Sequence, residues 1–139
     1  MGIKLTMDLE GAARETAPEA LSLQLDALTQ WNVVLMQRLL KEGHRIPLLY
    51  KSGVRYQREN YAAREENWRD FLSCLRHKGG DCEDLCAWRA AEIRVRQRQR
   101  ARCVYRRTRR ADGSTLYHIL VESPSHSGHI EDPSRLLGM

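Results

Sequence analysis

The chain has 139 residues, of which 42% are hydrophobic and 29% charged, and its formal net charge is +5. This length predicts a single domain with a buried core, and no apolar run approaches the roughly 20 residues that span a bilayer. The first residues show no apolar stretch followed by a small-residue cleavage site, so no secretory signal is predicted. We therefore expect a protein of the cytoplasm, or of a particle assembled there, with its four cysteines as free thiols.

Residues 1–16 are predicted to form a flexible N-terminal segment, followed by one domain over residues 17–139. A helical pattern begins at Pro18 and stops before Gly43, because leucines recur there at three-, four- and seven-residue spacings. Trp31 is expected on the same apolar face. The leucines of this face are Leu21, Leu25, Leu28, Leu35 and Leu39.

Residues 44–60 are typical of an extended segment, since Pro47 disfavours helix at the residue before it and Ser52-Gly53 predicts a turn. A second helix is expected from about Ala62 to Leu75. Its apolar side is formed by Trp68, Phe71, Leu72 and Leu75.

A third helix is predicted to start at Asp81 or Cys82 and to run to about Val95. Asp81 is a suitable N-cap, and Asp84 three residues later gives an acidic version of the capping box. The apolar side of this helix contains Leu85, Cys86, Trp88 and Ile93.

Strand-like segments follow the helices. Residues 101–109 and 115–122 are strand-like, the second because of its β-branched and aromatic residues, and the intervening Ala111-Asp112-Gly113-Ser114 is a strong hairpin signal. A polar turn over residues 123–127 leads to a short segment at 128–132. Helices followed by a small antiparallel sheet predict an α+β fold, in which the cysteine-bearing helix packs on the sheet.

Most of the positive charge lies in the arginine-rich block 94–110, RVRQRQRARCVYRRTRR. Such a block is compatible with nucleic-acid binding. It is equally typical of a solvated strand face, or of an edge strand that its charges protect from aggregation.

Cys82 stands at the predicted start of a helix, where unpaired backbone N–H groups and the helix dipole favour a thiolate. Gly79-Gly80 before it would allow a turn and the close approach of a substrate backbone, and the Cys82 N–H is a natural oxyanion donor. Three nearby carboxylates act in the opposite direction, because their charges raise a thiol pKa. These are Asp81, Glu83 and Asp84.

A nucleophilic cysteine also needs a base and a group that orients the base. Of the five histidines, His118 is favoured because it interrupts an otherwise apolar strand. A five-residue loop over 123–127 would place Asp132 on the same sheet face as His118, whereas a loop one residue longer or shorter would favour Glu131. The pairs expected from that loop are Glu122 with Gly128, Leu120 with Ile130, and His118 with Asp132.

The other cysteines fit a core role: Cys86 one helical turn after Cys82, Cys74 in the second helix and Cys103 in a strand. A zinc site is the alternative, but Cys82-x3-Cys86 has no matching second pair of ligands. We therefore expect no zinc site, and a cysteine nucleophile with a histidine base needs no metal or organic cofactor.

Several segments together resemble the transglutaminase-like superfamily of papain-like cysteine enzymes, and within it the small bacterial and bacteriophage-encoded transglutaminase-like cysteine proteinases. The resemblance covers roughly residues 45–139. The segments that carry it are Gly79-Gly80-Asp81-Cys82-Glu83-Asp84-Leu85, Leu116-Tyr117-His118-Ile119, Glu131-Asp132-Pro133-Ser134, Leu48–Tyr56 and Arg135–Met139.

The resemblance implies Cys82 as nucleophile, His118 as base and Asp132 as orienting acid, in a hydrolase or acyltransferase acting on amide or isopeptide bonds of a protein or peptide substrate. Candidates for an additional oxyanion-hole side chain are Tyr56, Gln57 and Trp68. Two alternatives remain open: a structural or assembly component of a phage particle without turnover, in contact with phage structural proteins, and nucleic-acid binding through the arginine block.

Overall fold

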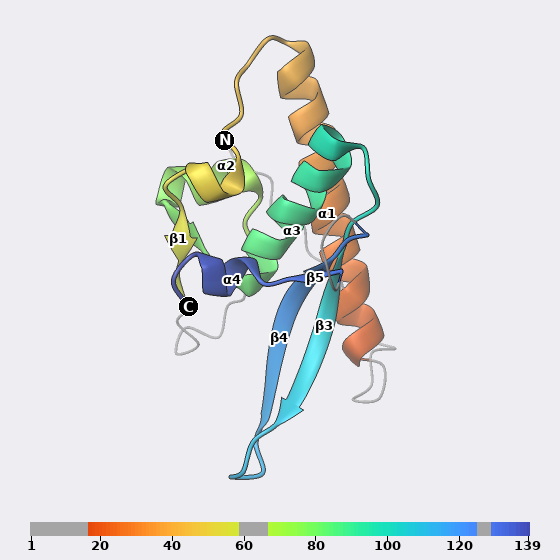
Figure 1. Ribbon diagram of the computed structural model, residues 1–139, viewed down its shortest axis with the longest axis vertical. Helices are drawn as coiled ribbons and strands as arrows, with labels where there is room; N and C mark the ends of the chain where they lie inside the picture. The colour runs from red at the N-terminus through yellow and green to blue at the C-terminus, as the bar shows by residue number, and fades with distance from the viewer. Residues whose placement is uncertain (1–16, 59–66, 125–128) are drawn as a thin grey trace.

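The computed structural model describes residues 17–58, 67–124 and 129–139. It has a mixed α+β fold, in which helices, including the one that begins at Cys82, pack against a three-stranded antiparallel sheet (Figure 1). The larger elements are α1 (Ala17–Lys41), α2 (Phe71–His77), α3 (Cys82–Glu92), β3 (Arg102–Arg109) and β4 (Thr115–Glu122). The shorter ones are η1 (Leu49–Lys51), β1 (Arg55–Tyr56), β2 (Gly79–Gly80), η3 (Ile93–Gln97), β5 (Ile130–Glu131) and α4 (Pro133–Leu136).

The first predicted helix is confirmed as α1. It is followed by Gly43 at φ +86°, a conformation that favours glycine after a helix. The five leucines of the predicted face all contact the core. Trp31 does not: it is 47% exposed, and its indole N–H donates to Asp70 at 3.0 Å.

The second predicted helix starts too early. Residues 67–70 are not helical, and α2 begins only at Phe71; residues 62–66 lie outside the described residues. Asp70 caps α2 by accepting from Ser73 N at 2.9 Å, and the Asn32 side chain accepts from Phe71 N at 3.0 Å. The start of α2 is therefore fixed by a local N-cap, Asp70, and by a residue of α1, neither of which the apolar periodicity reveals.

The segment 44–60 contains two short elements within its described part, η1 and β1. Strand β1 pairs in parallel with β2, so Arg55 lies opposite Gly79 and Tyr56 opposite Gly80. This two-stranded pairing was not predicted. It leads the chain directly into α3.

Helix α3 lies at the centre of the molecule and is buried on two sides. On one side Trp88 contacts Phe71, with ring centroids 5.7 Å apart, in a cluster with α1, η1 and α2. On the other side Cys86, Ala87 and Ala90 pack against α1 and the sheet. Small side chains on this second side allow the helix to approach the strands closely.

The predicted hairpin is confirmed: β3 and β4 pair from Arg102–Glu122 to Arg109–Thr115. Gly113 has φ +85° in the turn, and Arg110 N donates to Ser114 O at 2.8 Å. In Figure 1 the hairpin extends well beyond the helices at its turn end. The described part of the chain contains no helix long and apolar enough to cross a membrane.

The arginine block divides into two parts. Arg94 and Arg96 donate to the backbone carbonyls of Ala101 and Ile46, so they hold loops in place. The second part is the four arginines of β3, which are exposed on an edge strand of the sheet. This arrangement matches the expected solvated edge protected by charge.

Candidate active site

Cys82 is the first residue of α3, and its side chain is partly exposed. The acidic capping box is confirmed: Asp81 accepts from Asp84 N, and Asp84 accepts from Asp81 N, both at 3.2 Å. Asp84 also accepts from Arg69 N at 2.7 Å. Two of the three acids near Cys82 therefore cap the helix.

Gly79 and Gly80 have a different role from the one expected. They form the buried strand β2 rather than a turn open to a substrate. A Cβ at Gly79 would overlap the side chain of Gln57, and one at Gly80 would lie 2.9 Å from Asp84 Cβ. The glycines thus admit side chains of the protein itself, including Gln57, one of the candidate oxyanion residues.

His118 and Asp132 lie together, as the sequence predicts. The His118 Nε2 is 3.0 Å from Asp132 Oδ2, and both side chains are partly buried. Asp132 is also the N-cap of α4, where its other carboxylate oxygen accepts from Arg135 N at 3.2 Å. These contacts orient the carboxylate toward the imidazole, and they leave His118 Nδ1 as the ring nitrogen for proton transfer.

The predicted register between these residues is wrong by two positions. Glu122 pairs with Ile130 and Val121 with Glu131, so seven residues rather than five separate the paired ends. Because side chains alternate with a period of two, a shift of two keeps Asp132 on the face of His118. The carboxylate reaches the imidazole from the end of β5 instead of from a position directly opposite.

Cys82 is brought to the same strand, next to His118 in sequence. The Ile119 N–H donates to the Cys82 sulfur and lowers its pKa, and Cys86 Sγ donates to Ile119 O at 3.2 Å. The Cys82 thiol itself donates to Glu83 Oε2 at 3.2 Å. The structure therefore joins His118 and Asp132 by a hydrogen bond. It places the third member of the predicted triad, Cys82, against the peptide N–H of Ile119, and the Cys82 thiol proton is directed to Glu83.

The electrostatic surroundings of Cys82 favour the neutral thiol. Burial, followed by the charge of Glu83 and the hydrogen bond to it, raises the pKa of Cys82 well above its usual range. Burial also raises the pKa of Asp84 to about 8, with the charge of Asp81 as the second cause. The acidic residues near Cys82 thus cap the helix and also disfavour the thiolate form of Cys82.

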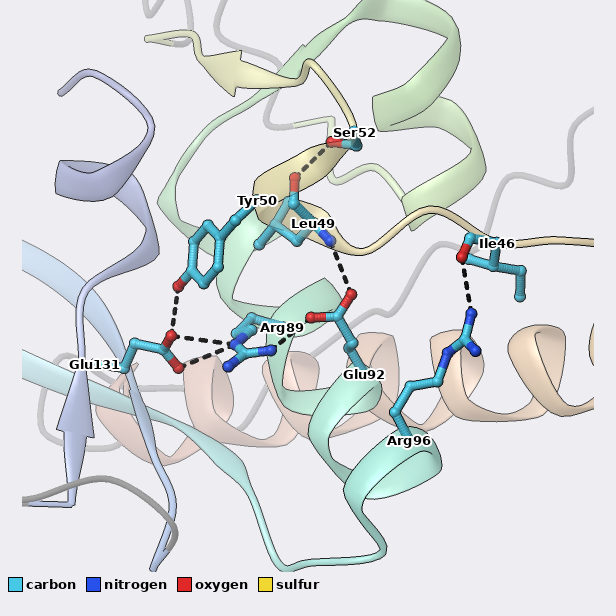
Figure 2. A network of polar contacts seen from close by, with 8 residues as sticks. All are labelled: Ile46, Leu49, Tyr50, Ser52, Arg89, Glu92, Arg96 and Glu131. Atoms are coloured by element: carbon cyan, nitrogen blue, oxygen red, sulfur yellow. Dashed lines mark hydrogen bonds and ion pairs between the residues drawn. The ribbon is translucent and has the colours of Figure 1, made fainter.

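Glu131, the alternative to Asp132, faces a separate buried network (Figure 2). It accepts from Tyr50 Oη at 2.6 Å and from Arg89 Nε at 3.1 Å. Arg89 also donates to Glu92 at 2.6 Å, and Glu92 accepts from Leu49 N at 2.8 Å. Although burial opposes its charge, these carboxylates raise the pKa of Arg89.

This network was not predicted, because its longer-range bonds join residues 42 to 81 positions apart in the sequence. Only the i, i+3 spacing of Arg89 and Glu92 was visible as a local signal. Its consequence for the site is positional: it fixes β5 to α3 and η1 through Glu131, the residue before Asp132.

The three remaining cysteines are buried free thiols, as expected for core residues. Burial raises the pKa of Cys103 to about 12 and raises those of Cys74 and Cys86 as well. Within residues 17–58, 67–124 and 129–139, no group of three or more His, Cys, Asp or Glu side chains is arranged to hold a metal ion.

Comparisons with known proteins give no match: no family model fits the chain, and neither the curated proteins nor the solved structures contain a similar one.

Proposed function

We propose that the protein is a cysteine-dependent hydrolase or acyltransferase acting on amide or isopeptide bonds, with a transglutaminase-like, papain-like core and a phage origin. Cys82 is the nucleophile, His118 the base and Asp132 the orienting acid. The observation that supports this most strongly is the His118–Asp132 hydrogen bond of 3.0 Å beside a cysteine at a helix N-terminus.

The reaction begins when the Cys82 proton passes to His118 Nδ1. The sulfur then forms a bond to the substrate carbonyl carbon, and the carbonyl oxygen gains negative charge, which the Cys82 N–H stabilises. As the C–N bond breaks, the leaving amine takes the proton from His118. Water or a second amine resolves the thioester, giving hydrolysis or transamidation. These steps use no metal or organic cofactor.

Before this reaction, the Cys82 thiol must break its hydrogen bond to Glu83. A rotation of the Cys82 or Glu83 side chain breaks the 3.2 Å hydrogen bond and turns the thiol toward the imidazole. The imidazolium and the helix N-terminus then stabilise the thiolate against the carboxylates. In this arrangement Glu83 therefore lowers the reactivity of Cys82, because it favours the neutral thiol.

Alkylation by iodoacetamide at neutral pH, followed by peptide mass spectrometry, tests the proposal. Cys82 should react at least about tenfold faster than the buried Cys103, and His118→Ala should slow Cys82 alone. Equal rates at the two cysteines, with no effect of His118→Ala, would remove the proposal.

A structural or assembly role in a phage particle is the second candidate. Two observations favour it: the raised pKa of the Cys82 thiol, and apolar side chains exposed along α1. The exposed side chains are Leu23, Trp31 and Val34. Co-purification of a stoichiometric partner that Trp31→Ala releases, and that Cys82→Ala does not, would support this role.

Nucleic-acid binding through the block 94–110 is a third candidate, favoured by the exposed arginines of β3. It predicts an affinity that falls steeply with salt and that weakens when Arg106, Arg107, Arg109 and Arg110 are replaced. Binding that is absent, or insensitive to salt, would exclude it.

A further inference from the structure

The backbone of β4 has two edges with different partners. Arg110 N donates to Ser114 O, and in an antiparallel pair the hydrogen-bonded positions alternate. Leu116, His118 and Leu120 therefore bond to β3 through their backbone groups. The residues between them direct N–H and C=O to the opposite edge, as Ser123 N does in donating to His129 O at 2.9 Å.

Among the described residues, this outer edge of β4 is covered at one end only. Strand β5 pairs with Val121 and Glu122, and the sulfurs of Cys82 and Cys86 contact the N–H and C=O of Ile119. At Thr115 and Tyr117, no strand among the described residues lies alongside. The open stretch thus ends at the candidate nucleophile.

Proteins normally protect an open edge with charge, a bulge or a covering segment. Strand β3 follows this rule, since its exposed residues are mainly arginines. The open part of β4 carries Leu116 at 44% exposure and Tyr117 at 52%, with no charged side chain between Thr115 and Tyr117. This stretch has the unprotected backbone and apolar side chains of a strand that accepts another strand.

We propose that the outer edge of β4 binds an extended, acidic segment of the substrate by strand addition; this inference rests on the proposed function. Two strand residues span about 7 Å, so a segment bonded to Tyr117 presents its next peptide group near Cys82. Binding energy gained along the edge then positions the scissile carbonyl.

The charge of the hairpin selects the acidic character of that segment. Arg106 pairs with His118 and Arg107 with Tyr117, so two exposed arginines of β3, one on each face of the hairpin, lie across β4 from its outer edge. Alternate substrate side chains contact Leu116 on one face and the stacked rings of Tyr117 and Tyr105 on the other, whose centroids are 5.1 Å apart. Carboxylates at the ends of such a segment pair with these arginines.

The test compares the rates at which two reagents label Cys82: iodoacetamide, and an acidic hexapeptide that ends in a vinyl sulfone. The peptide rate is divided by the iodoacetamide rate for each protein, which separates edge binding from thiol reactivity. N-methylation of the peptide amide that faces Tyr117 should lower this ratio about 3- to 10-fold on the unchanged protein, because one hydrogen bond is lost. A lysine-containing hexapeptide should label more slowly than the acidic one.

A protein variant provides the matching test from the other side. Tyr117→Pro removes an N–H that points away from β3, which an edge position tolerates, and it should lower the ratio more than Tyr117→Ala does. Equal ratios for N-methylated and plain peptides would overturn the inference, even where iodoacetamide labelling supports the proposed function. Suppression of peptide labelling by a single-stranded oligonucleotide, but not by a free acidic peptide, would also overturn it.

Discussion

Glu131 and Asp132 are neighbours in the chain, yet they lie in regions of opposite character. Glu131 is held from two directions by Tyr50 and Arg89 in a buried network (Figure 2). Asp132 is partly exposed, and it contacts the imidazole of His118 while it caps α4. The difference teaches how this fold separates two tasks: the Glu131 side fixes β5 in place, and the Asp132 side keeps a carboxylate accessible for chemistry.

Removing the cation of the Glu131 network should have the largest effect on the stability of the fold. Arg89→Leu leaves Glu131 and Glu92 buried without their shared cation, so the free energy of unfolding should fall by about 3–5 kcal/mol. Chemical denaturation measures this. Arg38→Leu, which removes an exposed partner of Glu42, is the matched control and should cost less than about 1 kcal/mol. Equal losses would show that the network does not fix the sheet.

The pH dependence of stability tests the role of Asp84 in the cap of α3. The pKa of Asp84 is raised by folding to about 8, so the folded state binds more protons than the unfolded state between about pH 4 and 8. Stability should therefore fall as the pH rises through this window, by several kcal/mol, since each pKa unit corresponds to about 1.4 kcal/mol. Thermal unfolding of Asp84→Asn should show a flatter profile; an unchanged slope would assign the dependence to other groups.

Two isosteric substitutions compare the adjacent carboxylates directly. Glu131→Gln removes a buried negative charge from Arg89 and should cost about 1–3 kcal/mol. Asp132→Asn keeps an oxygen for the α4 cap and should change stability by less than about 0.5 kcal/mol, while it slows the alkylation of Cys82. The opposite ranking in urea denaturation would reverse the roles assigned to the two residues.

The smallest expected effect concerns Glu83, which favours the neutral thiol of Cys82. Glu83→Gln removes a negative charge and a charged acceptor from the thiol, so the pKa of Cys82 should fall. Iodoacetamide should then label Cys82 about 3- to 10-fold faster at pH 7.5. Glu42→Gln, an exposed carboxylate just after the end of α1, should leave the rate unchanged. A slower rate in Glu83→Gln would mean that Glu83 assists the nucleophile.

Local signals predicted much of this arrangement. Strand-like composition and the Asp112-Gly113 turn were sufficient for β3 and β4, and the spacing of Asp81 and Asp84 was sufficient for the cap of α3. His118 and Asp132 were predicted to meet even though the loop length was wrong, because an even shift in register preserves the face.

The errors share a physical cause, which is dependence on distant partners. The start of α2 involves Asn32 as well as its local cap Asp70, and Trp31 donates to Asp70 instead of packing on the core. The Glu131 network depends on contacts between η1, α3 and β5. Periodicity identifies an apolar face, but it does not identify which charged groups meet across the core.

The central claim is that Cys82 and His118 act together on an acyl group. Reaction with p-nitrophenyl acetate, followed by intact-protein and peptide mass spectrometry, tests it directly. We predict an acetyl group on Cys82 that forms and is released in the wild-type protein, and that forms more slowly and persists in His118→Ala. An acetyl group spread over other residues, or equal kinetics in the two proteins, would contradict the claim.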